Sequence, residues 1–182
     1  MRLRTTLNNL HLILLLLPFL SLLPLLHSSS DRNLVEQTCH LTPFYDICLS
    51  ALRSSPTSAS SDLHGLAQII AGSVLQNANQ TLSQIQQLLD RSTADPKTEQ
   101  SLAYCAELYI PVVKYTLPQA IDALSRGRLG FAVYGISDAV DEIGGCQKLL
   151  SLESPVSEGN KLVTSLATVA LAIIKLLQKG FF

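Results

Sequence analysis

The sequence predicts an all-α protein: an antiparallel four-helix bundle with an N-terminal helical hairpin and two disulfides. Apolar residues recur every three or four positions in four long stretches, which is the period of an amphipathic helix. Short segments rich in Pro, Gly and Ser separate these stretches, and short links favour antiparallel neighbours. Four cysteines follow the first thirty residues, an even number that is typical of disulfide-stabilised secreted proteins.

Residues 1–30 have the features of a signal peptide. Arg2 and Arg4 precede a leucine-rich run from Leu10 to Leu26, and Ser28 and Ser30 place small residues at positions −3 and −1 of a cleavage site. Cleavage one or two residues earlier fits nearly as well. The alternative, a membrane span, is disfavoured because two prolines interrupt the apolar run.

The mature chain, residues 31–182, is expected to form one domain with a hairpin at 31–52 and the bundle at 53–182. Without the signal peptide it carries 11 basic and 14 acidic residues, a net charge of −3 that does not favour nucleic acid. In a secreted protein, Asn79-Gln80-Thr81 is a glycosylation sequon, which predicts an exposed position for Asn79.

Cys39, Cys48, Cys105 and Cys146 predict two disulfides, and four cysteines allow three pairings. Closing the short loop from Cys39 to Cys48 is topologically simplest and would leave Cys105 to pair with Cys146. On a chain-entropy estimate, these loops would stabilise the fold by roughly 2.7 and 3.9 kcal/mol. A zinc site is disfavoured because closely spaced cysteine pairs are absent from the sequence.

The hairpin is expected from two brief helices, about Asn33 to Thr38 and Pro43 to Ala51, since proline suits a first helical turn. The segment from Arg53 to Ser61 lacks apolar periodicity and is expected to connect the hairpin to the bundle.

The first bundle helix is predicted from residue 63 to residue 89, with Ser61 as the N-cap. The second extends from about Pro96 to Ser125, and Pro111 and Pro118 are expected to kink it. Its apolar stripe comprises Leu102, Cys105, Tyr109, Val112, Thr116 and Leu124.

Gly127 and Gly130 are expected to form a tight turn around Arg128 and Leu129. The third stripe then comprises Phe131, Ile136, Val140, Ile143 and Cys146, and the fourth comprises Leu162, Leu166, Val169, Ile173 and Leu176. The last apolar run is only about 16 residues long and precedes charged residues, which favours a bundle helix over a membrane anchor.

Catalytic chemistry is not predicted. His40 and His64 are the histidines outside the signal peptide, and both are expected to be ordinary surface residues. Asp138, Asp141 and Glu142 resemble an acid pair, but their helical spacing favours a solvated face. With no cofactor or metal indicated, a small rigid bundle is suited to binding another protein.

Several segments of the sequence resemble the plant invertase/pectin methylesterase inhibitor family. The resemblance begins at residues 34–39 (LVEQTC) and 42–49 (TPFYDICL), and includes 105–109 (CAELY) and 120–124 (AIDAL). It covers the whole mature chain. It implies a hairpin held by Cys39 and Cys48 and a four-helix bundle held by Cys105 and Cys146.

Invertase inhibitors of this family carry a Pro-Lys-Phe motif at the turn before the third bundle helix, which enters the carboxylate-lined substrate cleft of the enzyme. Here Leu129, Gly130 and Phe131 occupy these positions, so only the phenylalanine is retained. Our hypothesis is that Arg126 or Arg128 replaces the missing lysine, because a guanidinium group can pair with carboxylates.

The resemblance thus implies a reversible one-to-one inhibitor of a plant acid invertase (β-fructofuranosidase), located in the apoplast or cell wall, with the vacuole as an alternative. One alternative target is pectin methylesterase, bound through the polar faces of the middle helices. Another alternative is a protein of the same fold that inhibits neither enzyme.

Overall fold

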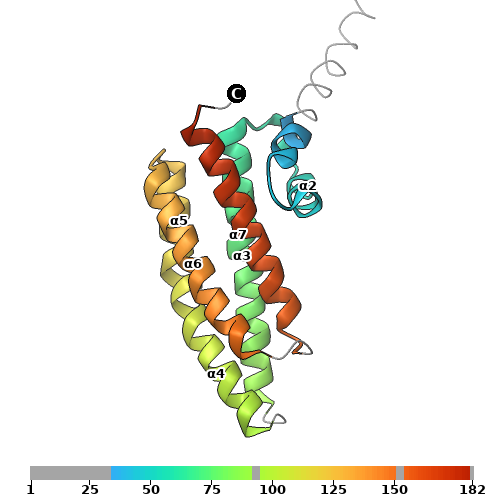
Figure 1. The fold of residues 1–182 in the computed structure, drawn as a ribbon, viewed down its shortest axis with the longest axis vertical. Coiled ribbons are helices and arrows are strands. Elements are labelled where there is room, and N and C mark those ends of the chain that lie inside the picture. Colours follow the sequence, from blue (N-terminus) through green and yellow to red (C-terminus); the bar gives the residue numbers. More distant parts are fainter. Residues whose placement is uncertain (1–33, 92–94, 151–153, 181–182) are drawn as a thin grey trace, which may run out of the picture.

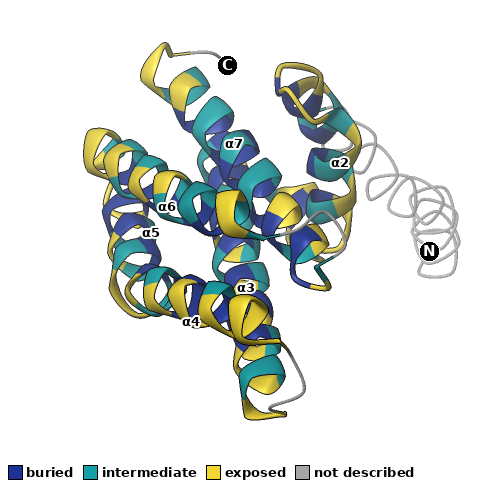
Figure 2. Cartoon of the chain, turned by 60° about the horizontal axis from the view of Figure 1, so that its bottom comes forward, coloured by how far each residue is buried: buried dark blue, intermediate teal, exposed yellow. Residues whose placement is uncertain are grey.

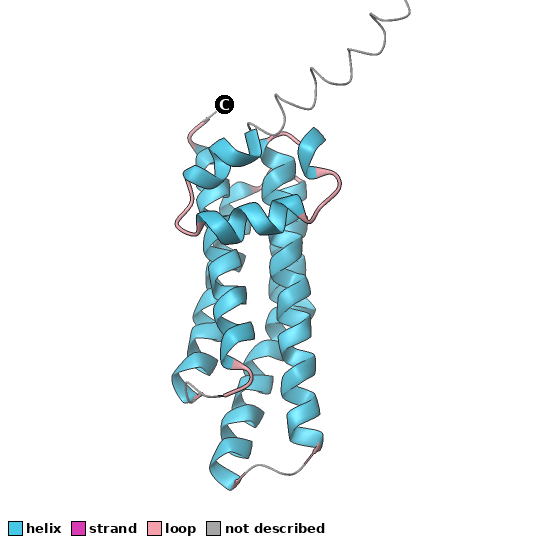
Figure 3. Ribbon diagram, turned by 90° about the vertical axis from the view of Figure 1, so that its right-hand side faces the viewer, coloured by secondary structure: helices cyan, strands magenta, loops and turns pink. Residues whose placement is uncertain are grey.

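The computed structural model describes residues 34–91, 95–150 and 154–180, so the expected signal peptide lies outside the described residues. Within these ranges the secondary structure is helical and contains no strand, which confirms the all-α fold class. Four long helical segments form the bundle, and the short hairpin lies beside one end of it (Figures 1 and 3).

The hairpin consists of a helical segment at residues 34–40 and α2 (Tyr45–Arg53), so it is shifted relative to the predicted helices. The first helix continues past Thr38, and α2 begins after Pro43 instead of at it. The reason lies in the turn, where both the backbone N–H and the hydroxyl of Thr42 donate to the Cys39 carbonyl.

A disulfide between Cys39 and Cys48 joins the two hairpin helices, and both cysteines are fully buried. An ion pair of 2.8 Å between Arg53 and Glu36 ties their far ends together. The predicted connector contains one short 3-10 helix, Ser58–Ser60.

The first bundle helix is α3 (Leu63–Asp90), close to its predicted range. Its N-cap is Asp62 and not Ser61, because the Asp62 carboxylate accepts the backbone N–H of Gly65 at 2.8 Å. The Ser61 hydroxyl instead donates to a carbonyl of the preceding turn.

The second predicted helix is interrupted where its prolines suggest. It divides into α4 (Pro96–Pro111), a π-helical turn (Val112–Thr116) and α5 (Leu117–Ser125). Pro111 and Pro118 have no backbone N–H, so the regular hydrogen-bond ladder loses a donor on each side of the π-helical turn.

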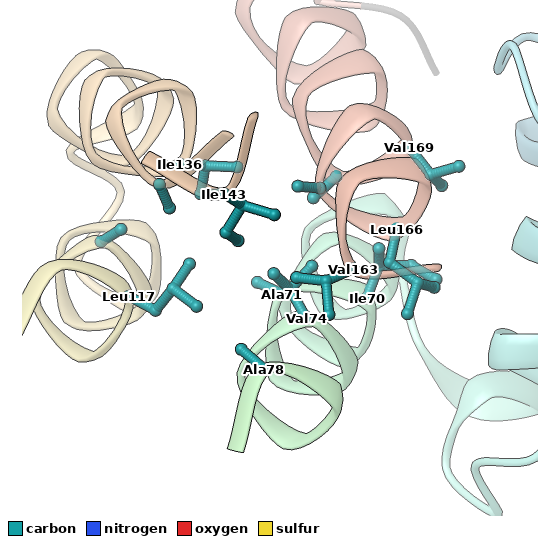
Figure 4. Packing of buried hydrophobic residues seen from close by; sticks show 14 of the residues in the cluster. Ile70, Ala71, Val74, Ala78, Leu117, Ile136, Ile143, Val163, Leu166 and Val169 are labelled. Atoms are coloured by element: carbon teal, nitrogen blue, oxygen red, sulfur yellow. The ribbon is translucent and has the colours of Figure 1, made fainter. Parts of the chain in front are cut away.

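The last two bundle helices are α6 (Leu129–Leu149) and α7 (Ser157–Gln178). α6 packs against α5 and α7, and α7 packs against α3 and α6. Their buried residues point into the core (Figure 4), and their exposed residues lie on the outer side of the bundle (Figure 2). The predicted stripes need two corrections, because Phe131 and Leu162 are exposed. The residues that fill the core from these helices include Ala132, Ile136, Ala139, Ile143, Val163, Leu166, Ala170 and Ile173.

A second disulfide joins Cys105 of α4 to Cys146 of α6, and the pairing is the one that the family resemblance implies. Nearby, the Tyr109 hydroxyl donates to Asn160 of α7 at 2.8 Å. Burial raises the pKa of the Tyr109 phenol, although a hydrogen bond with Thr81 acts in the opposite direction.

Among the described residues, α7 is the one helix long and apolar enough to cross a membrane, with a mean hydropathy of 1.6 in its most apolar window. In this structure, however, α7 packs against α3 and α6, with nine of its residues buried. This packing agrees with the expectation of a bundle helix.

Candidate protein-binding surface

The chain reverses between α5 and α6 through a hydrogen-bonded helix cap. The N–H of Gly127 donates to the Leu124 carbonyl at 2.9 Å, and the N–H of Arg128 donates to the Ala123 carbonyl at 2.8 Å. This pair of bonds is a Schellman motif, which requires a left-handed residue at its second-last position. Gly127 has a φ of 69° and fulfils that requirement without a steric penalty.

The helix cap sets the limits of the turn, and these limits differ from the predicted turn between Gly127 and Gly130. Gly130 does not bracket the turn, because α6 already begins at Leu129. We call residues 126–131 the arginine turn: Arg126 and Arg128 flank the glycine, and the first three residues of α6 follow. The turn lies at the same end of the bundle as the hairpin (Figure 1).

Both arginines of the turn bind one carboxylate. The Arg126 guanidinium donates to Asp122 Oδ1 at 2.9 Å, and the Arg128 guanidinium donates to Asp122 Oδ2 at 3.0 Å. All three side chains are exposed. The turn therefore presents two guanidinium groups side by side with a net charge of +1, which suits an acidic partner surface.

His64 supports the turn from α3. Its Nε2–H donates to the Leu124 carbonyl at 2.8 Å, and the side chain is half-buried. The expectation of an ordinary surface residue was therefore wrong for His64, whereas His40 is exposed and stacks on Tyr45 in the hairpin. The bond ties the end of α5 to the start of α3, so it limits movement of the turn.

Two aromatic side chains stand beside the arginines. Phe131 is 71% exposed and Tyr134 is 73% exposed, and both belong to α6. Leu129 is half-buried, so the phenylalanine is the most exposed apolar side chain of the arginine turn. Exposed aromatics of this size are typical anchors in protein interfaces.

A groove of about 620 Å³ lies between α5 and α6, and both of these aromatics line it. Its base forms where the two helices approach closely, because a Cβ atom on Gly135 would lie 2.9 Å from the Ala120 Cβ atom. Arg128, Phe131 and Asp138 are among the residues that line it.

Comparison with known proteins identifies the family. A model of the plant invertase/pectin methylesterase inhibitor family matches residues 33–173. The chain belongs to this family. It is therefore an inhibitor-family protein whose relatives act on invertase or on pectin methylesterase.

The relatives of this chain include proteins named as inhibitors of fructosidase and proteins named as inhibitors of pectinesterase. The chain is 31% identical over 144 residues to the cell wall / vacuolar inhibitor of fructosidase 1 of Arabidopsis thaliana, and the match covers 79% of this chain and 69% of that protein. It is 34% identical over 144 residues to the pectinesterase inhibitor of Actinidia deliciosa, covering 78% and 76%. A crystal structure of a mutant form of an Arabidopsis pectin methylesterase inhibitor aligns with a TM-score of 0.66 and 26% identity, covering 76% of this chain and 93% of that chain.

Within this inhibitor-family fold, the structure brings the predicted residues Arg126, Arg128, Leu129, Gly130 and Phe131 together in one turn. Sequence reasoning missed Asp122 and Tyr134. The spacing of four between Asp122 and Arg126 is that of a helical ion pair, and Tyr134 follows Phe131 by three on the same helix. Both spacings are visible in the sequence and could have indicated these residues.

Two other predictions concern the rest of the surface. Asn79 is exposed on α3, as the sequon requires, while the Thr81 hydroxyl is buried and bonded to the Asn77 carbonyl. Glycosylation of Asn79 stays a prediction. Asp138 and Asp141 are exposed, and in the part of the chain that the structure describes no three potential metal ligands converge.

Proposed function

We propose that the mature chain is secreted and inhibits a plant acid invertase by placing the arginine turn in the substrate cleft of the enzyme. The apoplast or cell wall is the proposed location, with the vacuole as an alternative. The complex is proposed to be one-to-one and reversible, with an interface of about 1,600 Å².

The observation that carries the proposal is the pair of guanidinium groups beside an exposed phenylalanine. Glycoside hydrolases generally use two carboxyl groups at the scissile bond, so their clefts are negatively charged. Arg126 and Arg128 present planar donors that match carboxylates, and they stand on a capped turn that holds their backbone in place. Phe131 supplies an apolar anchor next to them.

The relatives also support this target. Two inhibitors from Arabidopsis thaliana, named cell wall / vacuolar inhibitor of fructosidase 1 and 2, are similar to this chain, at 31% and 36% identity. The second match covers only 44% of this chain and 45% of that protein, so the first carries more weight.

Pectin methylesterase is the alternative target. The relative from Actinidia deliciosa is named as a pectinesterase inhibitor, and the aligned crystal structure is named as a pectin methylesterase inhibitor. This alternative would use the polar faces of the middle helices, where Glu107 of α4 and Lys114 of the π-helical turn are exposed.

Parallel titration of the two enzymes tests the proposal. The mature protein, with both disulfides formed, is added to purified acid invertase and to purified pectin methylesterase at acidic pH. We expect inhibition of invertase, and its loss in the double variant Arg126→Ala/Arg128→Ala. A control variant, Lys161→Ala/Lys175→Ala, removes two exposed cations from α7 and should inhibit like the original protein.

Inhibition of the esterase alone would contradict the proposal and move the binding surface to the bundle faces. Inhibition of neither enzyme would leave a non-inhibitory protein on the inhibitor scaffold. Equal loss in the control variant would show that net charge, and not the arginine turn, governs binding.

A further inference from the structure

The groove between α5 and α6 contains a carboxylate without a counter-ion. Asp138 lines the groove and is exposed. Among the described residues, none forms an ion pair with Asp138 or donates a hydrogen bond to it. The other acidic residue of the groove, Asp122, is already occupied by both arginines of the turn.

The walls of the groove are suited to a cation. Phe131 and Tyr134 line it, and their rings are largely exposed. Tyr134 precedes Asp138 by four residues on α6, a spacing that places the two side chains next to each other on one helix face. An aromatic face beside a carboxylate attracts lysine and arginine side chains by both charge and cation–π interaction.

The charges around the groove are separated along α6. Asp122 and Arg128 line the groove together with Asp138, and Asp122 also pairs with Arg126, so the net positive charge lies at the turn and the unpaired negative charge lies at Asp138. The positive charge of Arg128 is balanced by its ion pair with Asp122 at 3.0 Å. The unpaired carboxylate of Asp138 lies about two and a half helical turns from the start of α6.

We propose that this groove receives a lysine or arginine side chain of the inhibited enzyme, and so extends the interface from the arginine turn along α6. The identity of the enzyme rests on the proposed function above. The two parts of the surface then have opposite polarity, since the turn binds acidic groups and the groove binds a basic group. Such an arrangement would fix the orientation of the complex as well as strengthen it.

Inhibition of acid invertase by two matched variants tests the groove. Asp138→Asn removes the groove carboxylate, and Asp141→Asn removes an exposed carboxylate three residues further along α6 that does not line the groove. Because the two variants have the same net charge, long-range electrostatics are equal. We expect the inhibition constant to rise about tenfold or more for Asp138→Asn and less than about twofold for Asp141→Asn. Equal effects would overturn the proposal.

The aromatic wall is tested by a second pair of variants. Tyr134→Phe keeps the ring. Tyr134→Leu removes the ring but keeps more apolar surface than an alanine would. We expect Tyr134→Phe to inhibit almost as well as the original protein and Tyr134→Leu to inhibit about three- to tenfold less well. A larger loss for Tyr134→Phe than for Tyr134→Leu would show that the hydroxyl matters and would contradict a cation–π role.

A measurement without any enzyme separates this inference from the proposed function. The full mature chain is titrated with Nα-acetyl-arginine amide while the NMR signals of the Tyr134 ring are followed, with Nα-acetyl-alanine amide as the neutral control. We expect saturable shifts with the arginine derivative alone, retained in Asp141→Asn and lost in Asp138→Asn. Such shifts would support the groove even if invertase is not inhibited, whereas their absence would overturn it.

Discussion

Two guanidinium groups share one carboxylate in the arginine turn. Asp122 accepts Arg126 on one oxygen and Arg128 on the other, at 2.9 and 3.0 Å. Without that carboxylate, two like charges would lie next to each other on the surface and would repel one another. We therefore interpret Asp122 as a positioning residue that holds both cations at the tip of the turn.

The variant Asp122→Asn tests this interpretation. We expect inhibition of invertase to weaken about three- to tenfold, because the arginines separate and must be ordered again on binding. Since these ion pairs are exposed, the free energy of unfolding should change by no more than about 1 kcal/mol. Inhibition assays give the change in the inhibition constant, and a urea titration gives the change in the free energy of unfolding. Tighter inhibition would instead show that Asp122 competes with the enzyme for the arginines.

At the scale of elements, the close approach of α5 and α6 depends on one glycine. A Cβ atom at Gly135 would lie 2.9 Å from the Ala120 Cβ atom, a distance that real Cβ atoms do not tolerate. A Cβ atom at Gly144, on the same helix, would meet no atom within 4 Å beyond its chain neighbours and the backbone of α6 itself. The two glycines therefore have different roles in α6.

Gly135→Ala is expected to lower the free energy of unfolding by about 1–3 kcal/mol, because the helices must separate to admit the methyl group. Gly144→Ala should raise it by about 0.5–1 kcal/mol, because alanine is the better helix former. Urea titrations of the two variants check both signs. A stabilising Gly135→Ala would contradict the packing described here for α5 and α6.

Periodicity predicted the elements better than it predicted their faces. The helix at 63–89 and the interruption near Pro111 and Pro118 followed from spacing and from the missing proline donors. Phe131 was placed in the core stripe because a stripe is about 100° wide and a shift of one residue moves its edge. In the structure Ala132 fills this core position instead. Alanine is only weakly hydrophobic, so it contributes little to the periodic pattern from which the stripe was predicted.

Ser61 was predicted as the N-cap, although Asp62 follows it and is an equally good cap by residue type.

The long-range contacts of the site could not be predicted from residue type or spacing. Asp122 and Arg126 had a helical spacing, but the bond from His64 to the Leu124 carbonyl joins residues 60 positions apart. Only the packing of α3 on α5 brings them together.

At the scale of the whole molecule, two disulfides stabilise different parts. Cys39–Cys48 closes a separation of 9 residues within the hairpin, and Cys105–Cys146 closes a separation of 41 between two bundle helices. Loop-closure entropy grows with loop length, so the second bridge should contribute more to the free energy of unfolding.

Replacing each cysteine pair by alanine tests this difference. We expect a loss of about 4 kcal/mol for the Cys105/Cys146 pair and about 2.7 kcal/mol for the Cys39/Cys48 pair. Equilibrium urea unfolding of the two double variants gives the comparison. A larger loss from the hairpin pair would show that the hairpin stabilises the bundle far beyond its own loop.

We propose above that the arginine turn occupies the substrate cleft of an acid invertase. Initial rates of sucrose hydrolysis, measured over a range of sucrose concentrations with and without the mature protein, test it most directly. We expect the apparent KM to rise with inhibitor concentration while kcat is unchanged, because inhibitor and sucrose exclude each other. A fall in kcat at constant KM, or no effect on either constant, would contradict it.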